Sequence, residues 1–244
     1  MLASTSYQPD RGRITTSHWT PWRAVTPKDT PAWPAPNHSQ VIICSMPKVA
    51  SGSLDKMGPA ISVDQLAMRI ADLRTLRVAV VRHPFDRFMS WYNDKVIHGP
   101  NSLMSFYNSV LIGTTNATRF SASEYAASLA VEGMTWNLEP HLRAQTRHCA
   151  FDSLRFDLVV DLKSSGNLHE RINALLGQPD AIQPLPSTHN YSAVQSYKKN
   201  LTASDLGCDE QMQADLYRAY KNDFISIAKH GVVYATRYEC DQRL

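Results

Sequence analysis

The sequence predicts an α/β fold in three layers, with a central parallel sheet flanked by helices. Apolar runs at 40–44, 76–81 and 156–160 are typical of parallel strands buried on both faces. Helical segments alternate with these runs, which favours a parallel sheet. With 244 residues, 43% of them hydrophobic, the chain can bury one substantial core. We therefore predict one domain over residues 40–244, after an arm at 1–39 whose many prolines are expected to block regular structure.

Start and stop signals mark the expected helices. A Ser or Asn followed three residues later by Glu or Gln predicts a capping box, in which two side chains satisfy backbone N–H groups at the helix start. A longer helix is expected from about Glu210 to His230, with Gly231 as its stop. The expected boxes are Ser62 with Gln65, Ser121 with Glu124 in a helix ending near Gly133, and Asn167 with Glu170 in a helix ending at Gly177.

The first apolar run leads into a turn that is suited to binding a phosphate. Lys48 supplies a mobile positive charge, Ser51 and Ser53 can donate hydrogen bonds, and Gly52 lets the backbone approach an oxyanion closely. The pattern GxxxxGK[ST] is absent, and the lysine precedes the small residues. An ordinary ATP- or GTP-binding loop is therefore disfavoured.

The second apolar run also ends in residues that suit an anion. Arg82 follows strand 76–81, and Pro84 fits the first position of a helix because its missing N–H would be unpaired there. Ser90 lies off the apolar stripe of this helix. Arg82 and Ser90 could together hold a second phosphate, the arginine through two parallel hydrogen bonds.

These segments resemble the sulfotransferases that use 3′-phosphoadenosine 5′-phosphosulfate (PAPS), in particular the carbohydrate sulfotransferases of the chondroitin and HNK-1 type (sulfotransferase family 2-like) and their bacterial relatives. Pro47-Lys48-Val49-Ala50-Ser51-Gly52-Ser53-Leu54 is similar to that family's loop for the 5′-phosphosulfate. Arg82-His83-Pro84-Phe85-Asp86-Arg87, with Ser90 and Tyr92, is similar to its RxPFxRxxSxY segment for the 3′-phosphate. Later segments match less closely: 141–149 resembles HxxPQxxxC, 156–160 a YDFVG-like strand, and 190–192 an NxS element.

The resemblance implies a P-loop-like fold and transfer of a sulfuryl group from PAPS to a hydroxyl of a carbohydrate or small acceptor, without a metal. The product of the donor would be adenosine 3′,5′-bisphosphate. His141 would be the general base, with Glu139 as the rival base, Lys48 would neutralise the leaving oxygen, and Gln145 with His141 would contact the acceptor. The implied cofactor-binding residues are Lys48, Val49, Ala50, Ser51, Gly52, Ser53, Arg82, Ser90, Asn190 and Ser192. A nucleotide-dependent kinase and a non-catalytic module that binds adenosine bisphosphate remain the alternatives.

The composition of the chain disfavours several other classes of protein. A net charge of +3 does not indicate a nucleic-acid binder, and no apolar run is long enough for a membrane segment. Cys44, Cys149, Cys208 and Cys240 lack CxxC and zinc spacings, so most are expected to be reduced thiols. We expect a cytoplasmic protein if the chain is full length, and a Golgi-lumen protein if it is a trimmed form. The acceptor and the oligomeric state cannot be read from the sequence.

Overall fold

The structure is a computed structural model. The residues that it describes are 22–25, 40–44, 46–49, 61–131, 138, 140–149, 151, 153–177, 181–182 and 209–236.

The described residues form a four-stranded sheet in the order β1-β2-β3-β4. Strands β2 (Gln40–Cys44), β3 (Thr75–Val81) and β4 (Leu158–Asp161) are parallel, and β1 (Trp22–Val25) is antiparallel to β2. All three predicted strands are confirmed, with bounds shifted by at most two residues. Because β2, β3 and β4 are parallel, their carboxyl ends meet at one edge of the sheet.

Strand β1 lies inside the arm that was expected to lack regular structure. That expectation is wrong for Trp22–Val25, which pairs with β2 along its whole length. These residues fall between Pro21 and Pro27, so every one of them has a backbone N–H for the ladder. The division of the chain at residue 39 stays a prediction.

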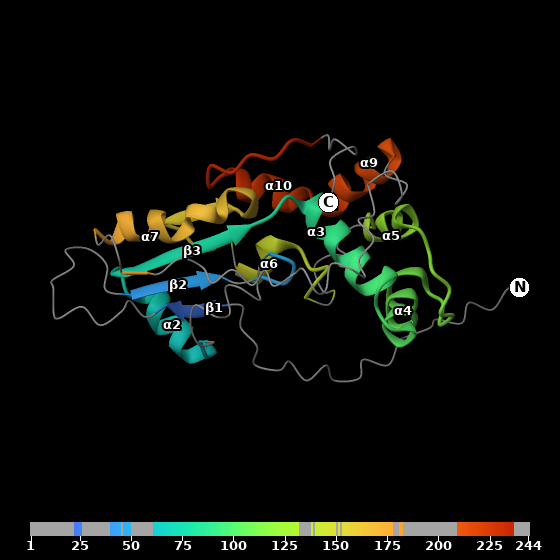
Figure 1. Ribbon diagram of the computed structural model, residues 1–244, viewed down its shortest axis with the longest axis horizontal. Helices are drawn as coiled ribbons and strands as arrows, with labels where there is room; N and C mark the ends of the chain where they lie inside the picture. The colour runs from blue at the N-terminus through green and yellow to red at the C-terminus, as the bar shows by residue number, and fades with distance from the viewer. Residues whose placement is uncertain are drawn as a thin grey trace, which may run out of the picture.

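Helices flank the sheet, as the fold class requires. In Figure 1, α7 and α10 lie on one side of the strands and α2 on the other, while α3, α4, α5 and α9 gather beyond the carboxyl ends of the strands. The helical elements are α2 (Val63–Ala71), α3 (Pro84–Trp91), the π-helix η1 (Tyr92–Ile97), α4 (Asn101–Tyr107), the π-helix η2 (Asn108–Ile112), α5 (Ala122–Leu129), α6 (Gln145–Cys149), the 3₁₀-helix η4 (Leu162–Asn167), α7 (Leu168–Leu176), α9 (Glu210–Ala219) and α10 (Lys221–Ala228).

Two of the three predicted capping boxes are confirmed. In each box the serine, Ser62 or Ser121, accepts through its side chain from the backbone N–H of the residue three positions later. The side chain of that later residue, Gln65 or Glu124, accepts from the backbone N–H of the serine. Asn167 precedes α7, but its side chain makes no capping bond, so the third box is wrong. The reason is that η4 runs directly into α7, which leaves Asn167 without the extended backbone of a capping residue. Gly177 ends α7 with a left-handed φ of 68°, as expected.

The single helix expected over 210–230 is also wrong, because the segment forms α9 and α10 with a break at Tyr220. The Tyr220 hydroxyl donates to the Leu142 carbonyl at 3.0 Å, and the side chain is buried. The break thus coincides with a tertiary contact of Tyr220. Gly231 follows α10 with a φ of 84°, as its stop position predicts.

Two groups of buried side chains form the core. One surrounds the sheet and includes β2, β3 and β4, and the other lies among α3, α5 and α9. Within the described part of the chain, no helix combines the length and apolar character needed to cross a bilayer.

Cys44 departs from the expectation of reduced thiols. It is fully buried at the end of β2 and is disulfide-bonded. Sequence spacing reveals metal motifs and neighbouring pairs, but it does not reveal which distant cysteines a fold brings together.

Candidate functional site

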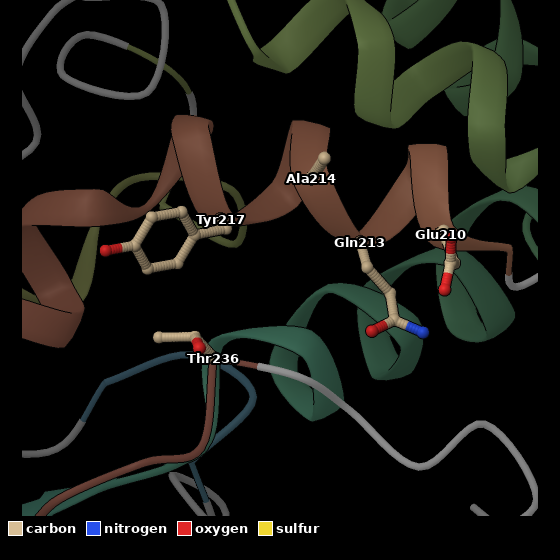
Figure 2. Close-up of a pocket in the computed structure, with 5 residues that line it drawn as sticks. All are labelled: Glu210, Gln213, Ala214, Tyr217 and Thr236. Atoms are coloured by element: carbon tan, nitrogen blue, oxygen red, sulfur yellow. The ribbon is translucent and has the colours of Figure 1, made fainter.

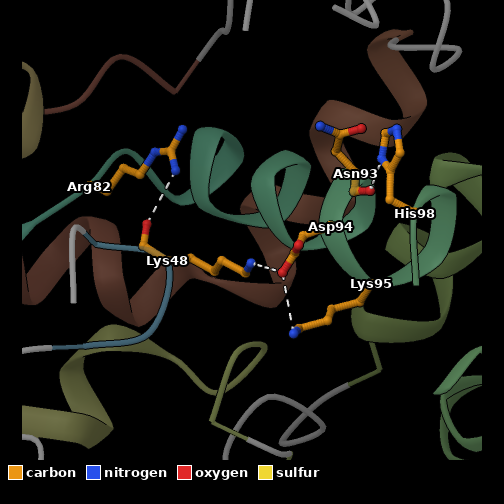
Figure 3. Close-up of polar contacts among 6 residues, drawn as sticks. All are labelled: Lys48, Arg82, Asn93, Asp94, Lys95 and His98. Carbon is orange, nitrogen blue, oxygen red and sulfur yellow. Dashed lines mark hydrogen bonds and ion pairs between the residues drawn. The ribbon is translucent and has the colours of Figure 1, made fainter. Parts of the chain in front are cut away.

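The two predicted phosphate-binding segments meet at the carboxyl edge of the sheet. Lys48 follows β2 and Arg82 follows β3, and these strands are neighbours. The Arg82 guanidinium donates through Nη1 to the Lys48 carbonyl at 3.2 Å (Figure 3). The structure therefore brings together the two cationic residues that the sequence assigns to opposite ends of one ligand.

The backbone of Lys48 adopts an unusual conformation. Its φ is 64°, in the left-handed region that non-glycine residues seldom occupy. A turn closed by the bond from Val49 N to Met46 O, 3.1 Å long, contains this residue. Such strain persists where the surroundings fix it, and here the guanidinium of Arg82 holds the carbonyl.

The ammonium of Lys48 binds Asp94, which lies in η1. Lys95 Nζ is 3.3 Å from the same carboxylate oxygen of Asp94. Burial alone would raise the pKa of Asp94, but the hydrogen bond and charge of Lys48, with help from Lys95, hold that pKa below its usual value. Asp94 is therefore ionised at neutral pH. Asp94 and Lys95 come just after the segment from Arg82 to Tyr92 and belong to no motif in the sequence.

Gln145 and Asp223 anchor the strand end that carries Arg82. The Gln145 amide accepts from Arg82 N at 2.9 Å and donates to Arg82 O at 2.8 Å, and its side chain is fully buried. The carboxylate of Asp223 accepts from the backbone N–H groups of Gln145 and Thr146, both at 2.9 Å. Gln145 thus links β3 to α6 in this structure, and its expected contact with the acceptor stays a prediction.

A buried arginine, Arg87, fastens the His141 turn to the Lys48 turn. The guanidinium of Arg87, 2% exposed, donates to the carbonyls of Pro47 at 3.2 Å, Pro140 at 2.9 Å and Arg143 at 2.7 Å. Half-buried His141 lies between the last two of these residues. Arg87 therefore connects the expected base to the expected phosphosulfate loop through one rigid group. Arg87 lies within the segment that resembles the 3′-phosphate motif, but its sequence position alone does not predict this role.

Two other histidines have structural roles. His83 begins α3: its Nδ1 accepts from Phe85 N, and its Nε2 donates to Ala235 O at 3.0 Å. His148 Nε2 donates to Pro140 O at 2.8 Å. Burial, followed by the charges of Arg87 and Arg143, lowers the pKa of His148 to about 3.

The remaining predicted residues are described only in part. Val49 is described and its side chain is fully buried in the core, so only its backbone could reach a ligand. Ser90 is half-buried on α3, about two turns after Arg82. Seven predicted residues lie outside the described ones: Ala50, Ser51, Gly52, Ser53, Glu139, Asn190 and Ser192.

A cavity of about 480 Å³ opens between α9 and the chain segment after α10. Figure 2 shows Gln213 and Tyr217 directed into it from α9, with Thr236 on the opposite wall. Thr236 follows Ala235, whose carbonyl accepts from His83 Nε2, but none of the described residues that line the cavity is a predicted site residue. Its lining, as far as the structure describes it, is Glu210, Gln213, Ala214, Tyr217 and Thr236 and contains no lysine or arginine.

The low pKa of His148 predicts that acid weakens the fold through this residue. Folded His148 stays neutral down to about pH 3, whereas the unfolded chain takes up a proton near pH 6.5. The stability that it contributes is thus present above pH 6.5 and is lost as the pH falls towards 3. Between pH 7.5 and 5 the loss is about 2 kcal/mol.

Urea unfolding of the wild type and of His148→Gln at several pH values measures this effect. The variant should show a flatter fall of the unfolding free energy with acid. Asn173→Ala, which removes a buried amide bonded to Ile182, is the control for general destabilisation and should keep the wild-type slope. Equal slopes in the wild type and His148→Gln would contradict the assignment.

Comparison with known proteins identifies the family. The sulfotransferase family matches residues 56–225, which is more than half of the chain. The match includes Arg82, Ser90, Asp94 and His141 and begins just after the loop that carries Lys48. No curated protein and no solved structure gives a significant match. On the family match, the chain belongs to the sulfotransferase family.

Proposed function

We propose that the protein transfers a sulfuryl group from PAPS to a hydroxyl of a carbohydrate or related acceptor. The observation that carries the proposal is the contact between Arg82 and Lys48 at the ends of two adjacent parallel strands. In the resemblance described above, these residues bind the 3′-phosphate and the 5′-phosphosulfate of one donor molecule. The family match supports sulfuryl transfer in general.

The donor fits the charges of this site. A molecule with a phosphate at each end of a nucleoside needs two cationic groups, which the Lys48 ammonium, paired with Asp94, and the Arg82 guanidinium, bonded to the Lys48 carbonyl, provide. The Ser90 hydroxyl would add a hydrogen bond to the 3′-phosphate. The remaining proposed donor contacts come from Ala50, Ser51, Gly52, Ser53, Asn190 and Ser192, together with the backbone of Val49.

The proposed reaction is an in-line displacement at sulfur. The acceptor oxygen forms a bond to sulfur while the bond from sulfur to the bridging oxygen of the donor breaks. The proton of the acceptor hydroxyl passes to His141, and the electron pair of the broken bond stays on the 5′-phosphate of adenosine 3′,5′-bisphosphate. Lys48 stabilises the negative charge that grows on this oxygen, so positioning and charge neutralisation supply the rate enhancement. No metal takes part in this scheme.

His141 is the proposed base, with Glu139 as its alternative. Histidine has an intrinsic pKa suited to accepting a proton at neutral pH. The bonds of Arg87 to the carbonyls on either side of His141 and to Pro47 support the choice, because they keep the His141 turn close to the Lys48 turn. Rigid support of this kind is what a positioned base requires.

A carbohydrate acceptor is proposed from the resemblance to carbohydrate sulfotransferases. The cavity beside α9 supports a neutral, hydroxyl-rich ligand, because its described lining combines a carboxylate, an amide and a tyrosine ring without a lysine or arginine. A screen of sugars, glycans and small alcohols for PAPS-dependent sulfation identifies the acceptor.

Two rival functions make different predictions. A nucleotide-dependent kinase would transfer phosphate from ATP, which the absent GxxxxGK[ST] pattern disfavours. A non-catalytic module would bind the bisphosphate without turnover. Sulfate transfer from radiolabelled PAPS separates the sulfotransferase from both rivals, and phosphate transfer from radiolabelled ATP separates the kinase from the non-catalytic module.

For the compartment, the disulfide at Cys44 favours the lumenal alternative over the cytoplasm, because disulfides persist mainly in oxidising compartments.

Arg82 is predicted to bind the 3′-phosphate. Arg82→Ala should weaken the binding of adenosine 3′,5′-bisphosphate by about 1.5–3 kcal/mol, the range for a hydrogen bond to a charged group. The loss should be larger than for adenosine 5′-monophosphate, which lacks the 3′-phosphate. Titration calorimetry measures both, and Arg74→Ala, which changes an exposed arginine, is the control. Stabilisation of the wild type by ATP but not by the bisphosphate would count against the donor.

Lys48 is predicted to act more on turnover than on donor retention. Charge on the bridging oxygen grows only as the sulfur–oxygen bond breaks, so Lys48→Ala should lower kcat strongly. Steady-state kinetics with PAPS separate the two roles, and Lys229→Ala at an exposed position is the control. An unchanged kcat with a raised KM for PAPS would show that the lysine merely binds.

His141 is predicted to be the general base. His141→Ala should reduce transfer by about 10²–10⁴-fold while leaving bisphosphate affinity nearly intact. The acidic limb of the pH–rate profile should vanish in this variant, and Glu139→Gln should have a much milder effect. His169→Ala on α7 serves as the control. If Glu139→Gln abolishes transfer while His141→Ala stays active, the carboxylate is the base.

A further inference from the structure

Two ammonium groups meet one carboxylate oxygen at the candidate phosphosulfate site. Lys48 Nζ is ion-paired with Asp94 Oδ2, and Lys95 Nζ lies 3.3 Å from that oxygen. The side chains of Lys48, Asp94 and Lys95 are 15%, 32% and 24% exposed, so surrounding atoms shield all three from much of the solvent. Figure 3 shows both ammonium groups directed at the same carboxylate. The arrangement is an oxyanion held between two cations, and the oxyanion belongs to the protein itself.

The backbone that supplies Asp94 and Lys95 is unusual. These residues lie in η1, where α3 widens into a π-helix and His98 N donates to Asn93 O, five residues earlier, at 3.2 Å. Single π-helical turns are rare and frequently mark functional sites. Lys48 comes from the separate turn after β2. The two cations thus reach a common point from different segments.

We propose that Asp94 is an internal counter-ion of the donor site, which holds Lys48 and Lys95 together until oxygens of the donor's 5′-phosphate or phosphosulfate replace it. Lys95 is then a second cationic residue for the 5′ end of the donor. This inference rests on the proposed function, because it takes Lys48 as the residue that binds this end.

The charges favour the exchange. Two ammonium groups around one carboxylate leave an excess of one positive charge, which a phosphate with its greater negative charge neutralises more fully. Asp94 repels the incoming phosphate because both are negative, so its charge opposes donor binding. Loss of a purely structural residue weakens binding, whereas removal of the Asp94 charge should strengthen it. The sign of the change therefore distinguishes a counter-ion from a support.

Titration calorimetry on the full chain tests the inference with two ligands. Adenosine 3′,5′-bisphosphate carries the 5′-phosphate, and adenosine 3′-monophosphate lacks it. Asp94→Asn, which keeps the size of the side chain, should bind the bisphosphate about 5- to 20-fold more tightly. Lys95→Ala should bind it about tenfold more weakly, and Lys95→Arg should restore most of the affinity. Affinity for the 3′-monophosphate should stay within about twofold in every variant, since the effect requires the 5′-phosphate.

Asp64→Asn, at an exposed position on α2, is the matched control and should bind both ligands like the wild type. Circular dichroism verifies the fold of each variant. If Asp94→Asn fails to fold, the test is the comparison of bisphosphate affinity between Lys95→Ala and Lys95→Arg. Unchanged bisphosphate affinity in Asp94→Asn and Lys95→Ala, or weaker binding by Asp94→Asn, would overturn the inference while the wild type still binds. A wild type that binds no bisphosphate contradicts the proposed function instead.

Discussion

The candidate site is organised around the hydrogen bonds that the buried guanidinium of Arg87 donates to three backbone carbonyls. Taking a guanidinium out of water is costly unless its N–H groups find acceptors, and three backbone carbonyls from two loops supply them. One of these carbonyls precedes Lys48, and the other two flank His141. Because the group is planar and its donors are fixed in direction, it sets the relative position of the two loops. Arg87 therefore ties the Lys48 turn to the turn that carries the proposed base, His141.

Beside Arg87, the site contains a cluster of three cationic side chains and one carboxylate. Lys48, Arg82 and Lys95 gather where two strands end and η1 begins, and Asp94 is the carboxylate that two of them share. Cations collected in this way repel one another unless an anion lies between them. A protein that must bind an anionic donor therefore has reason to carry its own anion at that point. The family match supports this view of the site, since sulfuryl transfer requires an anionic donor.

Sequence patterns predicted the parts of the fold that local chemistry determines. Apolar runs revealed β2, β3 and β4, and paired polar residues revealed the starts of α2 and α5. The break at Tyr220 was not predicted, and the hydroxyl bond of this residue to Leu142, far away in sequence, leaves no local signal. For the site, motif order identified Lys48 and Arg82, which the structure brings into contact. The contacts of Asp94, Lys95 and Asp223 were not predicted, because their partners are far away in sequence or come near only in the folded chain.

The central claim is that one donor molecule spans the Lys48 and Arg82 ends of the site. A crystal structure of the complex with adenosine 3′,5′-bisphosphate tests it most directly. We expect 5′-phosphate oxygens within hydrogen-bond distance of Lys48 Nζ, and a 3′-phosphate that contacts the Arg82 guanidinium and the Ser90 hydroxyl. A bisphosphate bound elsewhere, with neither phosphate at these residues, would contradict the account.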